Sequence, residues 1–151
     1  MIKSKKLNHS LFATSNIIVV HIDGGARGNP GPAAIGVVLE YGGTKKKYGE
    51  AIGNTTNNIA EYSALIFALK KIKQLFGKAK SKELRINVKS DSELLVRQMN
   101  GIYKIEDVKL RDLFVDIWNL RLDFKSVNFT HIPREENKEA DAMVNKALDK
   151  G

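Results

Sequence analysis

The sequence predicts an α/β fold in which helices pack on a mixed five-stranded sheet, and three observations support this prediction. Five short runs are β-branched or alternate between apolar and polar residues, as strands do. Longer segments with apolar residues at helical spacing lie between the later runs and after the last one. Segments rich in glycine separate the first three runs, which is typical of turns between antiparallel neighbours.

The first part of the chain predicts three antiparallel strands. Residues 17–22 are apolar at nearly every position, which indicates a central strand covered on both faces. Residues 24–32 contain four glycines and two prolines and are predicted to form a turn or loop. Residues 33–41 and 45–53 are predicted as the second and third strands, joined by a hairpin at Gly42-Gly43.

The rest of the chain alternates predicted helices and strands. Helices are predicted at residues 59–76, 92–101, 107–120 and 135–150, and strands at residues 84–89 and 125–131. Asn57 or Asn58 is suited to cap the first of these helices. The apolar residues expected to face inward are Ala64, Leu65, Ala68, Leu69, Ile72, Leu75 and Phe76 in that helix, and Leu110, Leu113, Phe114, Ile117 and Trp118 in the third. Because a crossover through a helix connects parallel strands, we expect the first and fourth strands to be parallel.

Composition limits the class of protein. The chain has 151 residues, a length typical of one domain, and no cysteine, which excludes disulfides, thiol nucleophiles and thiolate metal sites. Lysine and arginine number 25 against 17 acidic residues, and a net charge of +8 favours a polyanionic partner such as nucleic acid. Residues 1–16 are predicted to form a flexible basic tail before a domain at 17–151. The longest apolar run is too short to span a membrane, and we expect a cytoplasmic monomer with no membrane partner.

Four acidic residues interrupt the apolar pattern. Glu61 falls in the middle of the apolar stripe of its predicted helix, and Asp23 ends the buried first strand. Asp91 ends the fourth strand, and Asp141 borders the apolar stripe of the last helix. Each has an ordinary interpretation by itself: a residue of the first helical turn, a helix cap, or a solvated helix face.

Taken together, these carboxylates indicate a metal site. Parallel neighbouring strands end at the same edge of a sheet, where open α/β sheets place their ligands. Carboxylates gathered there would repel one another unless cations bound between them. Oxygen ligands without histidine or cysteine favour Mg²⁺ or Mn²⁺ over Zn²⁺. Two such ions about 3.5–4 Å apart can activate water for attack on a phosphodiester. His131, at the end of the fifth strand, is either a structural histidine or a group that handles protons near neutral pH.

Five segments resemble the type 1 ribonuclease H family, and together they reach from Ile17 to about Lys150. They are Ile22–Pro32, Asn54–Glu61, Ser90–Ser92, Asn100–Lys104 and Thr130–Asp141. The resemblance implies the ribonuclease H-like fold, with strand order 3-2-1-4-5 and helices on both faces of the sheet. It also implies hydrolysis of the RNA strand of RNA–DNA hybrids, leaving 5′-phosphate and 3′-hydroxyl ends.

The resemblance assigns roles to individual residues. Asp23, Glu61, Asp91 and Asp141 would hold two Mg²⁺ ions, for which Mn²⁺ can substitute, and His131 would assist proton transfer and product release. The residues assigned to the hybrid are Gly24, Asn29, Thr56, Asn57 and Asn58. Glycine lets backbone approach nucleic acid closely, and an asparagine amide suits recognition of the 2′-hydroxyl of RNA.

One departure from the family concerns substrate affinity. Some cellular members of the family insert a long basic segment, the handle, after the second helix. The corresponding segment of this chain, residues 101–108, is short. Candidates for that affinity are other lysines, which are otherwise an ordinary solvated helix and loop surface: Lys45, Lys46, Lys47, Lys70, Lys71, Lys73, Lys78, Lys80 and Lys82. Some archaeal members without the handle also cut double-stranded RNA, which leaves that substrate open. The residues are also compatible with a protein that binds hybrid without cutting it, and with a related nuclease that acts on DNA.

Overall fold

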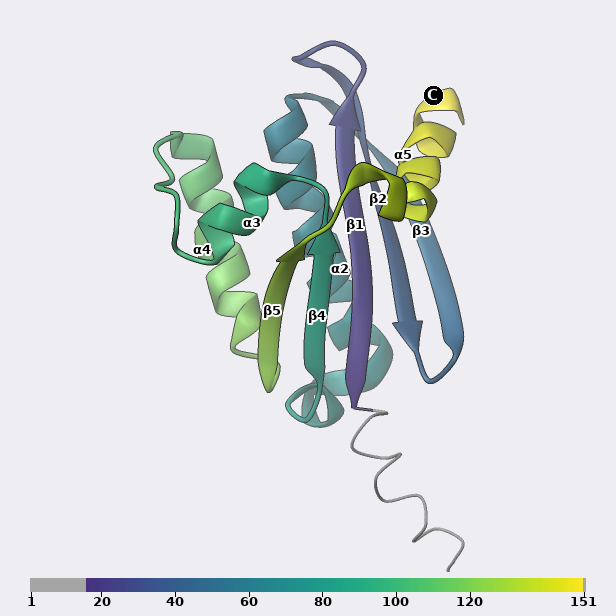
Figure 1. Ribbon diagram of the computed structural model, residues 1–151, viewed down its shortest axis with the longest axis vertical. Coiled ribbons are helices and arrows are strands. Elements are labelled where there is room, and N and C mark those ends of the chain that lie inside the picture. The colour runs from purple at the N-terminus through teal and green to yellow at the C-terminus, as the bar shows by residue number, and fades with distance from the viewer. Residues whose placement is uncertain (1–15, 151) are drawn as a thin grey trace, which may run out of the picture.

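The computed structural model describes residues 16–150, so the predicted tail at residues 1–16 lies almost wholly outside the described part of the chain. Five strands form one sheet, and helices cover both of its faces (Figure 1). The elements in chain order are β1 (Ile17–Ala26), β2 (Gly31–Tyr41), β3 (Thr44–Thr55), α2 (Asn57–Ser81), β4 (Arg85–Ser90), α3 (Glu93–Met99), α4 (Val108–Arg121), β5 (Ser126–His131), the 3₁₀ helix η1 (Arg134–Glu136) and α5 (Lys138–Lys150).

The sheet has the predicted mixed topology. Its strand order is β3-β2-β1-β4-β5, which confirms the order 3-2-1-4-5. Strands β1, β2 and β3 pair antiparallel, whereas β4 pairs parallel with both β1 and β5. The three strands β1, β4 and β5 therefore end at the same edge of the sheet.

The main core lies between the sheet and helix α2. Alternate residues of β1, namely Ile18, Val20 and Ile22, are fully buried on the face that α2 covers. On α2, Leu65, Leu69 and Ile72 are fully buried, as their helical spacing predicts. Burying a side chain of this size contributes about 1.5–3 kcal/mol, so this face fixes α2 firmly against β1.

Helix α5 packs on the opposite face, in front of β2 and β3 in Figure 1. Two strand glycines allow its backbone to come close, because a Cβ at Gly36 would overlap the carbonyl of Ala140 and one at Gly49 would overlap that of Met143. The Nζ atoms of Lys45 and Lys47 in β3 form ion pairs with the carboxylate oxygens of Glu139 in α5, at 3.0 and 3.2 Å. The start of α5, which carries Asp141, is thereby held over the sheet.

The glycine-rich segment is more regular than its composition predicts, and the prediction of a loop at residues 24–32 was wrong for most of it. Strand β1 continues to Ala26 and β2 begins at Gly31, with Gly24 opposite Ile35 and Gly25 opposite Ala34. Glycine lowers strand propensity, but the paired neighbour and the helices on both faces outweigh that preference here.

The helix boundaries also differ from the predictions. Thr56, rather than Asn57 or Asn58, caps α2, its side chain accepting a hydrogen bond from the Ile59 N–H at 3.2 Å. Helix α2 extends to Ser81 and is interrupted at Gly77, where φ is +83°. The expected last helix is divided into η1 and α5, which begins at Lys138. Periodicity alone does not mark such interruptions, because local turn geometry decides them.

Two apolar side chains expected to face inward are exposed. Trp118 of α4 is 48% exposed and Leu75 of α2 is 43% exposed. Trp118 lies about 100° around the helix from Ile117, which is buried at the centre of the contact with α2, so the ring falls outside that contact. The ring packs instead against Phe114 and Arg121. Within residues 16–150, none of the helices is both long and apolar enough to cross a membrane.

Candidate active site

Two of the four predicted acids lie side by side, one in β1 and the other directly after the parallel strand β4. Ile22 of β1 is in register with Ser90 of β4, and each is followed directly by an acid: Asp23 follows Ile22, and Asp91 follows Ser90. Asp23 is only 8% exposed. Asp91 does not cap α3, because Ser92 does so, accepting from the Leu95 N–H at 3.2 Å. The carboxylate of Asp91 is therefore not committed to a helix end.

Helix α2 brings the third acid to the same edge. A Cβ at Gly24 would overlap the backbone of Ala60 and Glu61, so only glycine at that position lets the first turn of α2 lie directly on β1. One oxygen each from Asp23, Glu61 and Asp91 then lies within 4.8 Å of the others. The Oε1 atom of Glu61 is buried and has no hydrogen-bond partner among residues 16–150.

Asp141, on α5, stands beside these three acids. It is exposed, and its negative charge lies close enough to contribute to the raised pKa of Asp23. The Nδ2 of Asn145 donates to the Asp141 carboxylate at 3.3 Å, and Arg27 donates to the Oδ1 of Asn145 at 3.4 Å. Arg27 also forms an ion pair with Asp149 at 2.8 Å. Asn145, itself contacted by Arg27 from just after β1, therefore orients the Asp141 carboxylate.

Burial and crowding raise the pKa values of two of these carboxyls. The pKa of Asp23 rises from 3.8 to about 8, mainly because burial penalises the charged form and then because Asp91 and Asp141 are nearby. The pKa of Glu61 is raised well above 4.5, again chiefly by burial and then by Asp23 and Asp91. The backbone of Gly24 opposes both shifts, and Arg134 opposes that of Glu61. Without a positive charge between them, these carboxylates cannot all ionise at low cost.

This donor set fits a hard divalent cation. The three clustered acids offer oxygen ligands only, and one of the oxygens is buried without a partner in the described part of the chain. Mg²⁺ and Mn²⁺ bind such carboxylate groups, whereas Zn²⁺ sites favour nitrogen and sulfur ligands. Asp23, Glu61 and Asp91 could therefore hold a metal ion, and Asp141 lies close enough to contribute to its surroundings.

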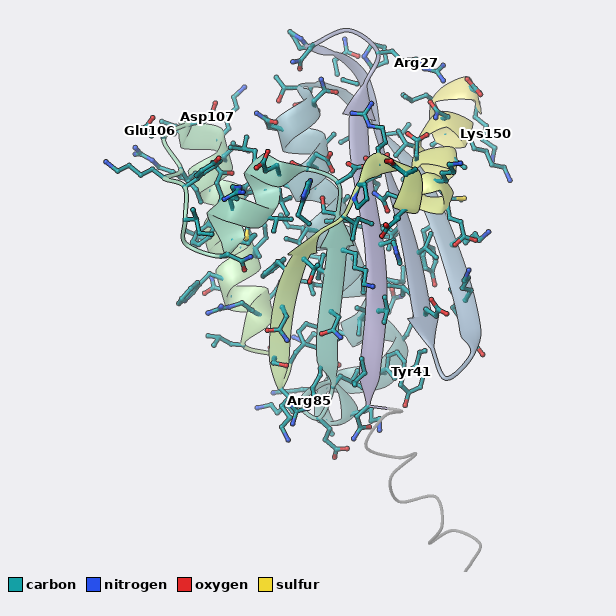
Figure 2. The ribbon with its side chains drawn as sticks, in the orientation of Figure 1. Arg27, Tyr41, Arg85, Glu106, Asp107 and Lys150 are labelled. Carbon is teal, nitrogen blue, oxygen red and sulfur yellow. The ribbon has the colours of Figure 1, made fainter. Side chains whose placement is uncertain are left out.

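The acids line a polar cleft of about 380 Å³ at one end of the sheet. Its other polar lining residues include Arg27, Asn57, Arg134 and Asn145. In Figure 2, Arg27 marks this end of the molecule, whereas Tyr41 and Arg85 mark the other end. A separate pocket near Tyr41, of about 270 Å³, is lined mostly by apolar side chains and by no acid. The four predicted acids therefore share the polar cleft and are absent from the apolar pocket.

Comparison with known proteins identifies the family. The family described as reverse transcriptase-like matches residues 21–147. A ribonuclease H of Ruthia magnifica is 33% identical over 152 residues, covering 89% of this chain and 97% of the relative. The chain belongs to the ribonuclease H family.

Two further ribonucleases H are more similar in sequence. Ribonuclease HI of Halobacterium salinarum is 42% identical over 131 residues, which is 85% of this chain and 63% of that protein. The structure of LC11-RNase H1 in complex with an RNA/DNA hybrid is 46% identical and has a TM-score of 0.83, covering 88% of this chain and 97% of the other. The chain spans less than two thirds of the Halobacterium relative and 35% of three longer mycobacterial relatives.

The residues that the ribonuclease H resemblance assigns to the hybrid lie around the turn between β1 and β2 and the start of α2. The Oδ1 of Asn29 accepts from the Asn57 N–H at 2.9 Å, and the Oδ1 of Asn57 accepts from the Ala26 N–H at 2.8 Å. These bonds use the carbonyl side of each amide, so the Nδ2 side can donate to a ligand. Asn58 is exposed, and the Thr56 hydroxyl caps α2. Gly24 lines the cleft, but the structure also gives it a packing role against α2.

His131 and the lysines lie outside the cleft. His131 is exposed at the end of β5, in register with Ser90, one residue before Asp91. Four of the lysines expected to bind phosphate already form ion pairs with acids of this chain: Lys45 and Lys47 with Glu139, Lys73 with Asp123, and Lys80 with Glu83. Exposed pairs of this kind are weak, so a phosphate can still compete for them.

Three polar residues at the site were not predicted individually from the sequence. Arg134 and Asn145 line the cleft, and Asn137 is buried beside Asp91. The segment Thr130–Asp141 that carries the ribonuclease H resemblance contains two of them, which was the available signal. Asn145 lies one helical turn after Asp141, so helical spacing could have indicated it.

Proposed function

We propose that this protein is a metal-dependent endoribonuclease that hydrolyses the RNA strand of RNA–DNA hybrids. One observation carries the proposal: oxygens of Asp23, Glu61 and Asp91 gather within 4.8 Å in a chain of the ribonuclease H family. The similarity to LC11-RNase H1, whose structure contains an RNA/DNA hybrid, supports the choice of substrate. We infer that residues 17–151 form the domain responsible.

The acids would bind the catalytic cations. In this proposal Asp23, Glu61, Asp91 and Asp141 hold two Mg²⁺ ions, and Mn²⁺ can replace them. When bound, such ions activate the attacking water and stabilise the leaving oxygen of the phosphodiester. In the reaction a bond forms between the water oxygen and phosphorus, and the bond from phosphorus to the 3′ oxygen breaks. The products carry a 5′-phosphate and a 3′-hydroxyl.

The remaining site residues bind the substrate or move protons. The Nδ2 groups of Asn29 and Asn57, with Asn58 beside them, would donate to acceptors in the minor groove, where the 2′-hydroxyl distinguishes RNA from DNA. Thr56 would contact a phosphate of the DNA strand. His131, exposed at the end of β5, would pass a proton to the departing 3′ oxygen and take it back from solvent.

The test is cleavage of labelled nucleic acid in the presence and absence of Mg²⁺. We expect endonucleolytic products from the RNA strand of a hybrid, none after chelation, and none with Asp23→Asn. Binding of the hybrid without cleavage at any metal concentration would support a binding protein instead. Cleavage of duplex DNA in preference to hybrid would assign the protein to a different class of nuclease.

Double-stranded RNA is the second substrate to compare, under the same conditions. The loop between α3 and α4 is short and carries Glu106 and Asp107 as well as Lys104, so this loop is not a concentrated basic handle (Figure 2). Recognition of the nucleic acid then depends more on Asn29, Asn57 and Asn58, at the edge of the cleft-bearing end of the sheet. We propose that double-stranded RNA is cut more slowly than hybrid.

A further inference from the structure

Asn137 is an almost fully buried amide side chain near the acids. It lies between η1 and α5 and is 1% exposed. Its Nδ2 donates to the Ile22 carbonyl at 2.8 Å and approaches the Oδ2 of Asp91 at 3.4 Å. The backbone carbonyl of Asn137 accepts the first hydrogen bond of α5, from the Asp141 N–H at 3.1 Å. One residue thus contacts the chain at three places that carry acids.

Each of these contacts fixes a different acid. Ile22 directly precedes Asp23, so the bond to its carbonyl fixes β1 next to Asp23. The contact with Oδ2 of Asp91 restricts rotation of that carboxylate. The bond to the Asp141 N–H starts α5 at a defined position. A side chain buried to this degree has few alternative rotamers, so its two contacts hold Asp23 and Asp91 relative to each other before any cation binds. The Asp141 contact is made by the backbone of Asn137 and places the start of α5.

The Oδ1 of Asn137 is a second observation at the same place. It is buried and has no hydrogen-bond partner among the described residues. An unpaired buried acceptor costs about 1–3 kcal/mol, so packing alone would favour an apolar residue of similar shape. A requirement for the donor group at Nδ2 explains why an amide stands here.

Building on the proposed function, we propose that Asn137 is a positioning residue whose side chain pre-arranges Asp23 and Asp91 for cation binding. Its Nδ2 donates to the carbonyl that precedes Asp23 and to the Asp91 carboxylate, and it binds neither the cation nor the substrate itself. Partners that orient metal ligands in this way commonly change metal affinity or activity by about 10–100-fold when removed.

Mn²⁺ titration by calorimetry tests this directly, without relying on nuclease activity. We expect Asn137→Ala to weaken Mn²⁺ binding by about tenfold or more. Asn137→Leu keeps the branched shape while removing both polar groups, and it should show the same loss if the alanine variant folds poorly. Gln98→Ala is the matched control: Gln98 is also a buried amide, bonded to Tyr62 and to the Lys104 carbonyl, but it lies away from the acids. The Gln98→Ala variant should be less stable than wild type, but its Mn²⁺ affinity should stay within about twofold. A twofold change is much smaller than the loss expected when a group that orients metal ligands is removed.

Kinetics on hybrid provides a second measurement. In the Asn137 variants kcat should fall at limiting Mg²⁺ and recover as Mg²⁺ is raised, with KM for the hybrid unchanged. Equal Mn²⁺ affinity in wild type and Asn137→Leu would overturn the inference while leaving the proposed function intact, as would an equal loss in Gln98→Ala. A wild-type protein that takes up no Mn²⁺ would overturn the metal centre itself, and the inference with it.

Discussion

Replacing Asp23 with asparagine should stabilise the metal-free protein, and the gain should grow with pH. In the unfolded chain Asp23 loses its proton near pH 3.8, whereas in the folded protein its pKa is about 8. Between these values the unfolded state binds fewer protons, so the free energy of unfolding of wild type falls as pH rises. Asparagine does not titrate, and the variant loses this contribution to the slope.

The magnitude follows from the size of the shift. A difference of about 4 pKa units, at 1.36 kcal/mol each, corresponds to a penalty on the order of 5 kcal/mol once Asp23 is fully ionised. The neighbouring acids share protons with Asp23, and a buried asparagine amide must itself be desolvated. We therefore expect Asp23→Asn to exceed wild type by about 2–4 kcal/mol near pH 8 and to differ little near pH 4.

The assay is urea unfolding in a chelator across this pH range, followed by circular dichroism. The same series with Mn²⁺ should raise the unfolding midpoint of wild type and leave that of Asp23→Asn nearly unchanged, because a bound cation stabilises only the state that binds it. A constant difference between the two proteins from pH 4 to pH 8 would refute the electrostatic argument. Lower stability of the variant near pH 8 would refute it as well.

Three further predictions concern the other residues of the site. Gly24→Ala should lower the free energy of unfolding by about 1–3 kcal/mol and reduce kcat, because the added Cβ would push Glu61 away. Gly25→Ala is the control: its Cβ would meet only a side chain at 3.8 Å, so denaturation and cleavage assays should show neither change. Asn57→Ala should raise KM for the hybrid and also lower the free energy of unfolding by about 1 kcal/mol, because the Oδ1 of Asn57 accepts a hydrogen bond from the Ala26 N–H. Replacing the exposed Asn58 with alanine should raise KM alone, and equal losses of stability in the two variants would contradict this interpretation. His131→Ala should lower kcat by about 10²-fold with unchanged stability and Mn²⁺ affinity, and full activity would exclude it from proton transfer.

Much of the fold was predictable because its signals are local. The buried β-branched run at residues 17–22 indicates the central strand, and the helical spacing of Leu65, Leu69 and Ile72 indicates the core face of α2. The boundaries were less predictable. The end of β1 at Ala26 depends on pairing with β2, and the start of α5 at Lys138 depends on the turn at Asn137.

The candidate site divides in the same way. The sequence by itself determined which acids break the apolar pattern and that Asp23 and Asp91 lie near a common edge of the sheet, because strand direction and side-chain period follow from local patterning. It placed the end of β1 too early, since the strand continues past Asp23 to Ala26. Only the tertiary structure decided that Glu61 reaches them, since its approach requires Gly24 to lie against the backbone of α2. The same is true of Asn137, whose contacts join segments separated by up to 115 residues. Such contacts depend on how elements pack, and short-range periodicity carries no information about that packing.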